Sequence, residues 1–180
     1  MKTLDLWPTN IFVFEDFLSE EYFCQISKLN LQNQQHVELF ELNNKIIESI
    51  TEIFNKPISE KNLSVEITEI WNNTKKQNDP HRPHCHANND YSGIYYVTRG
   101  CSTHFLDPRP QALTFDLGYN QSVAKIRATP NKCIFFPSWL IHWVDDDFFD
   151  DSSKQRQTIA FNIKFRGQIG KKGSFTEVLA

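Results

Sequence analysis

The chain has 180 residues, which is enough to enclose one sizeable hydrophobic core and predicts a single domain over residues 1–180. A net charge of −3 and a pI near 6.1 argue against a non-specific nucleic-acid binder, which would carry a basic surplus. No stretch approaches the ~20 apolar residues that span a bilayer, and the N-terminus lacks the apolar segment of a secretory signal. With no export signal, we expect the four cysteines, which form no CxxC pair, to be reduced thiols in a cytoplasm. From the charge and the lack of an apolar span we expect no nucleic-acid or membrane partner.

Residues 1–60 are predicted to hold a short strand, over residues 11–14, and two helices. Ser19 is a candidate N-cap for the first helix, since Glu20 and Glu21 follow in the first turn, where the helix dipole favours negative charge. The second helix, about residues 38–54, is expected to end before Pro57. Its apolar residues fall on one stripe: Leu39, Leu42, Ile46, Ile50 and Ile53.

After Pro57 the helical period is not expected to return, and residues 61–168 hold short β-branched and aromatic runs separated by turn-forming clusters. Eight such runs at this spacing predict a mainly β jelly roll or barrel, with the N-terminal helices packed on one sheet. The acidic segment 145–151 is interpreted as a solvated loop, with a lid as the alternative. The predicted strands are residues 63–71, 93–98, 102–106, 112–115, 122–128, 133–136, 140–144 and 156–165.

The sequence His84-Cys85-His86 is the first sign of chemistry. In an extended segment His84 and His86 share a face, so both imidazoles can bind one metal ion. His142 interrupts an otherwise apolar strand, where it needs a partner or a metal. Facing strands of a barrel can bring the three together, and such a facial set with open positions suggests non-haem Fe(II). Alone, the HxH pair is equally typical of two surface histidines, and a lone His142 is more often a hydrogen-bonded core histidine. Cys85 is expected to be a small buried side chain and not a ligand.

The last predicted strand has two contrasting faces. Its apolar face carries Ile159, Phe161, Ile163 and Phe165 with period two. The other face carries Arg156, Thr158 and Asn162. A guanidinium and a hydroxyl two residues apart can receive a carboxylate, because the guanidinium offers a bidentate fork and the hydroxyl a further donor. The alternative is an ordinary solvent-facing edge, but Ala160 and Asn162 would make a poor solubilising face.

Taken together, these residues resemble the family of 2-oxoglutarate- and Fe(II)-dependent oxygenases, whose members are often phage or bacterial. The resemblance covers roughly residues 65–165, with a looser match in the N-terminal helices. It rests on the order and spacing of Trp71-Asn72, His84-x-His86-x-Asn88, Ser92-Gly93-Ile94-Tyr95-Tyr96-Val97, Asp107-Pro108-Arg109, Phe135-Phe136-Pro137-Ser138-Trp139-Leu140-x-His142-x-Val144 and the segment from Arg156 to Asn162.

The resemblance implies a double-stranded β-helix (a jelly roll, cupin-like) with iron at its open end. His84 and His142 match the first and last iron ligands of the family pattern, and Arg156 with Thr158 matches the pair that binds the far carboxylate of 2-oxoglutarate. Tyr95, Asn72 and Asn162 are further candidates for co-substrate contacts. Packing in the aromatic core is an equally good account of Tyr95.

One position departs from the wider superfamily, in which the second ligand is usually Asp or Glu. Here that position is His86, and three neutral imidazoles leave the full charge on the metal. His86 is the favoured ligand, while Asp90 or a water is the alternative source of an oxygen ligand. His81, His104 and His36 show no spacing argument and are treated as background.

The function predicted from these features is hydroxylation by an Fe(II) enzyme that uses 2-oxoglutarate and O2. Two alternatives stay open: a three-His dioxygenase that needs no 2-oxoglutarate, and a non-catalytic cupin-like metal-binding protein. The intact Arg-x-Thr pair speaks against a purely structural site. The substrate, a small molecule or a peptide, cannot be read from the sequence. Sheet edges in such barrels often pair, so a homodimer is also an open expectation.

Overall fold

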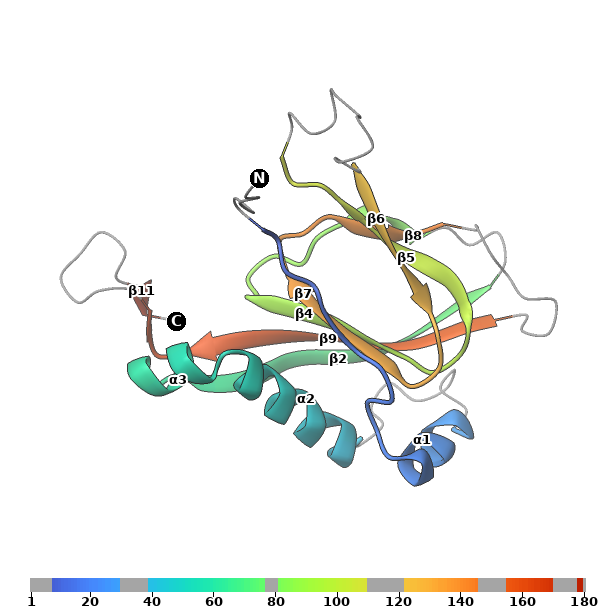
Figure 1. The fold of residues 1–180 in the computed structure, drawn as a ribbon, viewed down its shortest axis with the longest axis horizontal. Coiled ribbons are helices and arrows are strands. Elements are labelled where there is room, and N and C mark those ends of the chain that lie inside the picture. Colours follow the sequence, from blue (N-terminus) through green and yellow to red (C-terminus); the bar gives the residue numbers. More distant parts are fainter. Residues whose placement is uncertain are drawn as a thin grey trace, which may run out of the picture.

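Two antiparallel sheets face each other in the computed structural model, which describes residues 8–29, 39–76, 81–109, 122–145, 155–169 and 178–179 (Figure 1). The larger sheet has the order β1 (Phe12–Phe14), β7 (Lys132–Pro137), β4 (Tyr91–Tyr96), β9 (Gln155–Arg166) and β2 (Ser64–Lys76). The smaller sheet has the order β3 (His81–His84), β8 (His142–Val144), β5 (Gly100–Leu106) and β6 (Val123–Ala128). A separate pair, β10 (Gln168–Ile169) with β11 (Val178–Leu179), lies after the barrel.

The predicted jelly roll is confirmed by this arrangement, in which the chain alternates between the two sheets from β2 to β5 and again from β6 to β9. The predicted strand 112–115 lies outside the described residues, as do residues 146–151 of the acidic segment 145–151. Strand β2 is longer than predicted, because its polar C-terminal half pairs with β9 as far as Lys76. Among the described residues, no helix is long and apolar enough to cross a membrane.

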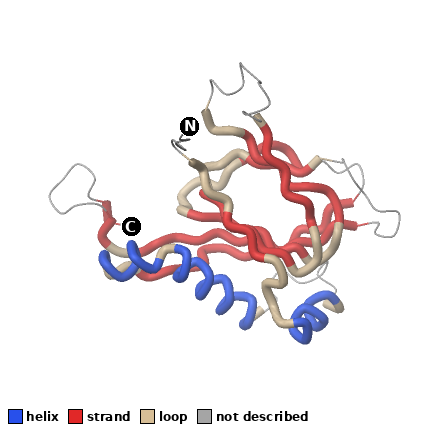
Figure 2. The backbone as a smooth tube through the Cα atoms, in the orientation of Figure 1, coloured by secondary structure: helices blue, strands red, loops and turns tan. Residues whose placement is uncertain are grey.

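The helices pack against the larger sheet on the side away from the smaller one (Figure 2). Helix α1 (Glu20–Ser27) begins where Ser19 was predicted to cap it, since Ser19 Oγ accepts the N–H of Tyr22 at 3.3 Å. Helix α2 (Phe40–Ile53) buries its predicted apolar stripe. The expectation that no helix follows Pro57 was wrong: α3 (Asn55–Lys61) holds Pro57 in its first turn, where no backbone N–H is needed.

The hydrophobic core has two parts, one on each face of the larger sheet. The part between sheet and helices contains the predicted apolar face of β9, with Ile159, Phe161 and Ile163 fully buried. The part between the two sheets is smaller and includes Ile94 and Phe136. The period of two in β9 therefore sends its polar residues into the space between the sheets, where the candidate site lies.

A β-bulge in β2 sets which of its residues face that space. The pairing of β2 with β9 shifts between Ile67 and Glu69, so Thr68 is the extra residue. Ile67 and Ile70 both pack on the helix side. From Glu69 onward, alternate residues such as Trp71 and Asn73 face the smaller sheet.

Candidate metal and co-substrate site

Three histidines converge at one end of the barrel. His84 ends β3 and His142 begins β8, and the two are directly paired across these antiparallel strands. His86 lies two residues beyond β3, where its backbone N–H donates to the carbonyl of Ser138 at 2.9 Å. One ring nitrogen from each histidine lies within 4.8 Å of the other two. This separation suits a single metal ion bound by three imidazoles.

Backbone carbonyls orient two of the rings. Nδ1 of His84 lies 2.8 Å from the carbonyl oxygen of Arg82, and Nδ1 of His142 lies 3.0 Å from that of Leu140. With the proton on Nδ1, each ring donates this hydrogen bond and keeps the lone pair of Nε2 for a metal. Such contacts fix the tautomer and the orientation of metal-binding histidines.

The surroundings of two of the rings, His86 and His142, favour the neutral form. The pKa of His142 is lowered to about 3, mainly by burial and also by the neighbouring histidines, while the hydrogen bond to the Leu140 carbonyl acts in the opposite direction. Burial also lowers the pKa of His86, together with His84; the Glu69 carboxylate acts in the opposite direction. Since a metal binds the neutral imidazole, the site is ready to bind without first losing a proton from these two rings.

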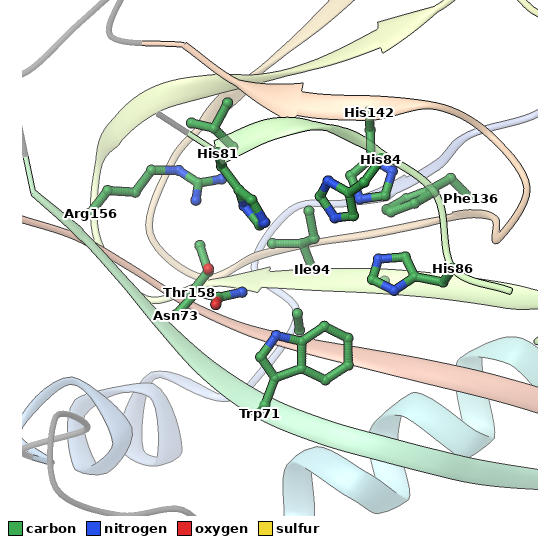
Figure 3. Close-up of a pocket in the computed structure, with 13 residues that line it drawn as sticks. Trp71, Asn73, His81, His84, His86, Ile94, Phe136, His142, Arg156 and Thr158 are labelled. Atoms are coloured by element: carbon green, nitrogen blue, oxygen red, sulfur yellow. The ribbon is translucent and has the colours of Figure 1, made fainter. Parts of the chain in front are cut away.

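Arg156 lies at the far end of the narrow pocket that the histidines share (Figure 3). Its side chain is 3% exposed; Nε donates to the carbonyl of Cys101 at 3.1 Å and Nη2 to Thr103 Oγ1 at 3.0 Å. The guanidinium also lies over the Tyr96 ring, 5.3 Å from its centroid. Thr158, 1% exposed, lines the same pocket. A fixed cation and a hydroxyl thus stand in one pocket with the three histidine rings, an arrangement that suits a carboxylate ligand of a bound metal.

The other three candidate co-substrate residues do not line this pocket. Tyr95 faces the helices, where its hydroxyl donates to Asn131 Oδ1 at 3.0 Å. Asn72 lies between two pocket residues on β2 and therefore faces the other side. Asn162 does face the space between the sheets, where Nδ2 donates to Glu69 Oε2 at 2.8 Å and Oδ1 accepts from Ser92 Oγ at 2.7 Å. Its contacts are to protein groups beside the pocket.

Four residues that the sequence did not single out for the site lie in or against the pocket: His81, Trp71, Asn73 and Tyr96. His81, treated as background, stacks on His84 with ring centroids 4.5 Å apart. Trp71 lies 5.6 Å from the His86 ring. An alternation count along β2 from Trp71 could have found Asn73, but the bulge that sets the phase leaves no mark in the sequence.

The alternative oxygen ligand, Asp90, lies outside the three-histidine group. Its Oδ2 accepts the backbone N–H of Phe165 at 2.8 Å. Cys85 was expected to be buried, but its side chain is exposed, because the chain leaves the sheet after His84. The geometry therefore favours His86 over Asp90 as the third metal-binding side chain.

A polar chain supports the segments that carry the rings. From Glu69 it runs through Asn162 to Ser92, and Ser92 Oγ lies 2.8 Å from Ser138 Oγ. Ser138 in turn accepts the N–H of His86. Strands β2, β9 and β4 and the turn after β7 are thus connected next to the rings, and the hydrogen bonds of Ser92 to Asn162 and Ser138 are buried, which makes this part of the site rigid.

A family model described as "Putative 2OG-Fe(II) oxygenase" matches residues 69–162, which include the three histidines, Arg156 and Thr158. The chain belongs to this family. It is therefore a 2-oxoglutarate-dependent Fe(II) oxygenase, as the sequence motifs suggested, with iron, 2-oxoglutarate and O2 as the cofactor and co-substrates of its family. A search of curated protein sequences found no match.

Solved structures of oxygenases share the fold at low sequence identity. HygX from Streptomyces hygroscopicus, crystallised with iron, is 10% identical with a TM-score of 0.59, covering 87% of this chain and 82% of HygX. The epimerase SnoN, in complex with Fe3+, alpha ketoglutarate and nogalamycin RO, is 9% identical with a TM-score of 0.60, covering 96% and 90%. A Pseudomonas putida prolyl-4-hydroxylase is 11% identical with a TM-score of 0.57, covering 88% and 89%. These similarities establish the double-stranded β-helix fold.

Proposed function

We propose that His84, His86 and His142 hold the iron of this oxygenase, and that Arg156 and Thr158 hold the far carboxylate of 2-oxoglutarate. The observation that carries the proposal is the convergence of three ring nitrogens within 4.8 Å in the same pocket as a buried guanidinium. The substrate oxidised is a small molecule or a peptide, and the reaction is hydroxylation of a C–H bond.

The residues present fit both groups. Three neutral nitrogen donors on one side of an ion leave coordination positions for a chelating co-substrate and O2. They cancel none of the metal's charge, so the dianionic co-substrate supplies the negative charge that a carboxylate ligand usually provides. When bound, iron and 2-oxoglutarate supply O2 activation, in which one oxygen atom enters succinate as CO2 is released and the other enters the substrate as a hydroxyl.

The protein positions 2-oxoglutarate relative to the metal and keeps water away from the reacting groups. Arg156 and Thr158 fix one end of 2-oxoglutarate, so its other end meets the metal in one orientation. Ile94 and Phe136 line the pocket between them and exclude water from the reacting groups. The Nδ1 contacts of His84 and His142 keep the rings aimed at the ion.

The test measures O2 uptake and succinate formation by the iron-loaded protein, with and without 2-oxoglutarate. We expect both to require 2-oxoglutarate, and Arg156→Ala to raise the 2-oxoglutarate concentration needed at least tenfold. Arg156→Ala that consumes 2-oxoglutarate like the parent would overturn the assignment of Arg156. Uptake of O2 without 2-oxoglutarate would instead indicate a three-His dioxygenase.

The proposal also covers the cellular location, the class of substrate and the oligomeric state. We expect action in the cytoplasm, because none of the four cysteines of this chain forms a disulfide. A nucleic-acid substrate is not expected for a chain with net charge −3. A homodimer is proposed on the general ground that barrel edges pair, and sedimentation would test it.

A further inference from the structure

A second, larger cavity of about 710 Å³ lies along the edge strand β2, lined by Asn43 of α2 at one end and by His86, one of the three histidines, at the other. This volume is within the range of small-molecule sites. His86 and Trp71 line both this cavity and the narrow pocket, so a ligand bound here lies against one of the metal-binding rings. Arg156 lies at the other end of the narrow pocket (Figure 3). The cavity thus reaches the metal site from the side that the co-substrate leaves open.

The β-bulge of β2 builds the wall of this cavity. Thr68, the extra residue, donates from Oγ1 to Asn89 Oδ1 at 2.7 Å, which ties the edge strand to the loop that follows His86. Beyond the bulge, Glu69 and Trp71 are two residues apart on one strand face, and both line the cavity. Its position is therefore fixed by strand pairing and by side-chain hydrogen bonds.

The chemistry of the cavity favours a cation. Glu69 contributes a carboxylate whose Oε2 accepts from Asn162 Nδ2 at 2.8 Å, which holds the negative charge in place. Trp71 contributes an indole ring beside it, and ring faces attract ammonium and guanidinium groups. None of the described residues that line the cavity is Lys or Arg. A cationic group gains from both contacts there, whereas an anion is repelled.

We propose that this cavity receives the primary substrate, and that Glu69 and Trp71 select a substrate that carries an ammonium or guanidinium group. The preference of the cavity for a cation follows from Glu69 and Trp71 and needs no metal. That the cavity is the substrate site rests on the proposed function of the neighbouring histidines.

The test is a two-dimensional NMR titration of the full-length, metal-free protein, followed at the indole N–H signal of Trp71, which Trp71→Phe identifies. Two probes of matched shape are compared, benzylammonium and benzyl alcohol. We expect benzylammonium to shift this signal at about fivefold lower concentration than benzyl alcohol, the effect of one exposed ion pair with Glu69 and a cation–π contact with Trp71. Glu69→Gln should bring the two probes close to equal affinity.

The matched control is Glu66→Gln, which makes the same charge change on the same strand. Glu66 is exposed and pairs with Arg166, outside the cavity. The preference for benzylammonium should survive in Glu66→Gln. Equal affinity of both probes in the parent protein, a preference that persists in Glu69→Gln, or no shift of the Trp71 signal would each overturn the proposal.

A second readout separates this proposal from the function of the histidines. Mn2+ bound to the protein should relax the protons of benzylammonium, and His142→Ala should remove this relaxation while the Trp71 titration is unchanged. Failure of Mn2+ to bind would contradict the proposed metal site, and the cation preference would still be decided by the metal-free titration. Bound Mn2+ that does not relax the probe would show that the cavity is not the substrate site.

Discussion

The backbone N–H of His86 donates to the carbonyl oxygen of Ser138 at 2.9 Å, and Ser138 lies four residues before His142. This bond ties the loop that carries one ring to the turn that precedes another. The third ring, His84, is tied to His142 by strand pairing. The three rings therefore converge through contacts between protein groups.

Metal binding should stabilise the fold. At a free metal concentration of 100 times Kd, a ligand that binds the native state alone adds about 2.7 kcal/mol, and for a chain of this size that corresponds to a rise in Tm of about 5–10 °C. Differential scanning calorimetry with Co2+ should show this rise in the parent and not in His142→Ala. The matched control is His81→Ala, which removes an imidazole from the pocket outside the three-ring group; loss of the rise in this control would argue against the ligand set.

The stability of the metal-free protein should fall in acid because of His142. Its pKa is lowered from 6.5 to about 3 by burial, so between these values the unfolded chain binds a proton that the folded chain does not. The contribution of the neutral ring to the free energy of unfolding is complete above pH 6.5 and decreases as the pH falls toward 3. His142→Gln cannot take up this proton. Urea unfolding should therefore show that the free energy of unfolding decreases less between pH 7 and pH 5 in His142→Gln than in the parent. Equal decreases would contradict a lowered pKa of His142 in the folded protein.

Thr158→Val should weaken 2-oxoglutarate binding while leaving the fold intact. The change keeps the shape of a side chain that is 1% exposed and removes its hydroxyl. A lost hydrogen bond to a charged group of about 1.5 kcal/mol corresponds to an increase of tenfold or more in KM for 2-oxoglutarate. Thr74→Val, the same change on the face of β2 turned away from the pocket, should leave KM unchanged. Succinate formation measures both, and equal KM values in the two variants would refute the role of Thr158.

Gly93→Ala should destabilise the protein by overpacking the core on the helix side of the larger sheet. An added Cβ would overlap the ring of Phe161 and lie 2.8 Å from the carbonyl oxygen of Ile134. Overpacking of this kind costs about 2 kcal/mol or more. Because the ring causes the overlap, the loss on adding Gly93→Ala should be smaller in a Phe161→Leu background, as a double-mutant cycle by chemical denaturation would show. If the decreases in the free energy of unfolding were additive, the overlap with the Phe161 ring would not be the cause of the destabilisation.

The sequence carries the fold class because its signals are local. The cap at Ser19, the stripe on α2 and the two faces of β9 each depend on neighbouring residues, and the structure confirms all three. Helix α3 was missed because Pro57 reads as a stop signal, although the first turn of a helix tolerates it. The polar end of β2 was missed because its strand character comes from pairing with β9.

The sequence predicts the site residues that belong to a spaced motif. It does not predict those whose position depends on which face of a strand they occupy. The HxH pair and His142 were identified by spacing, and the structure brings them together. Tyr95 and its neighbour Tyr96 are indistinguishable in sequence, yet Tyr95 faces the helices, whereas Tyr96 lies beneath Arg156. Asn72 and Asn73 differ in the same way, since the bulge at Thr68 sets which one faces the pocket. Such choices depend on long-range pairing that a single sequence does not display.

A crystal structure of the protein with Fe2+ and 2-oxoglutarate, grown without O2, tests the central claim most directly. We predict one ion bound by a nitrogen of each of His84, His86 and His142, with the far carboxylate of 2-oxoglutarate on Arg156 and Thr158. An ion held by Asp90, a His86 ring turned away from the ion, or 2-oxoglutarate bound without contact to Arg156 would contradict it.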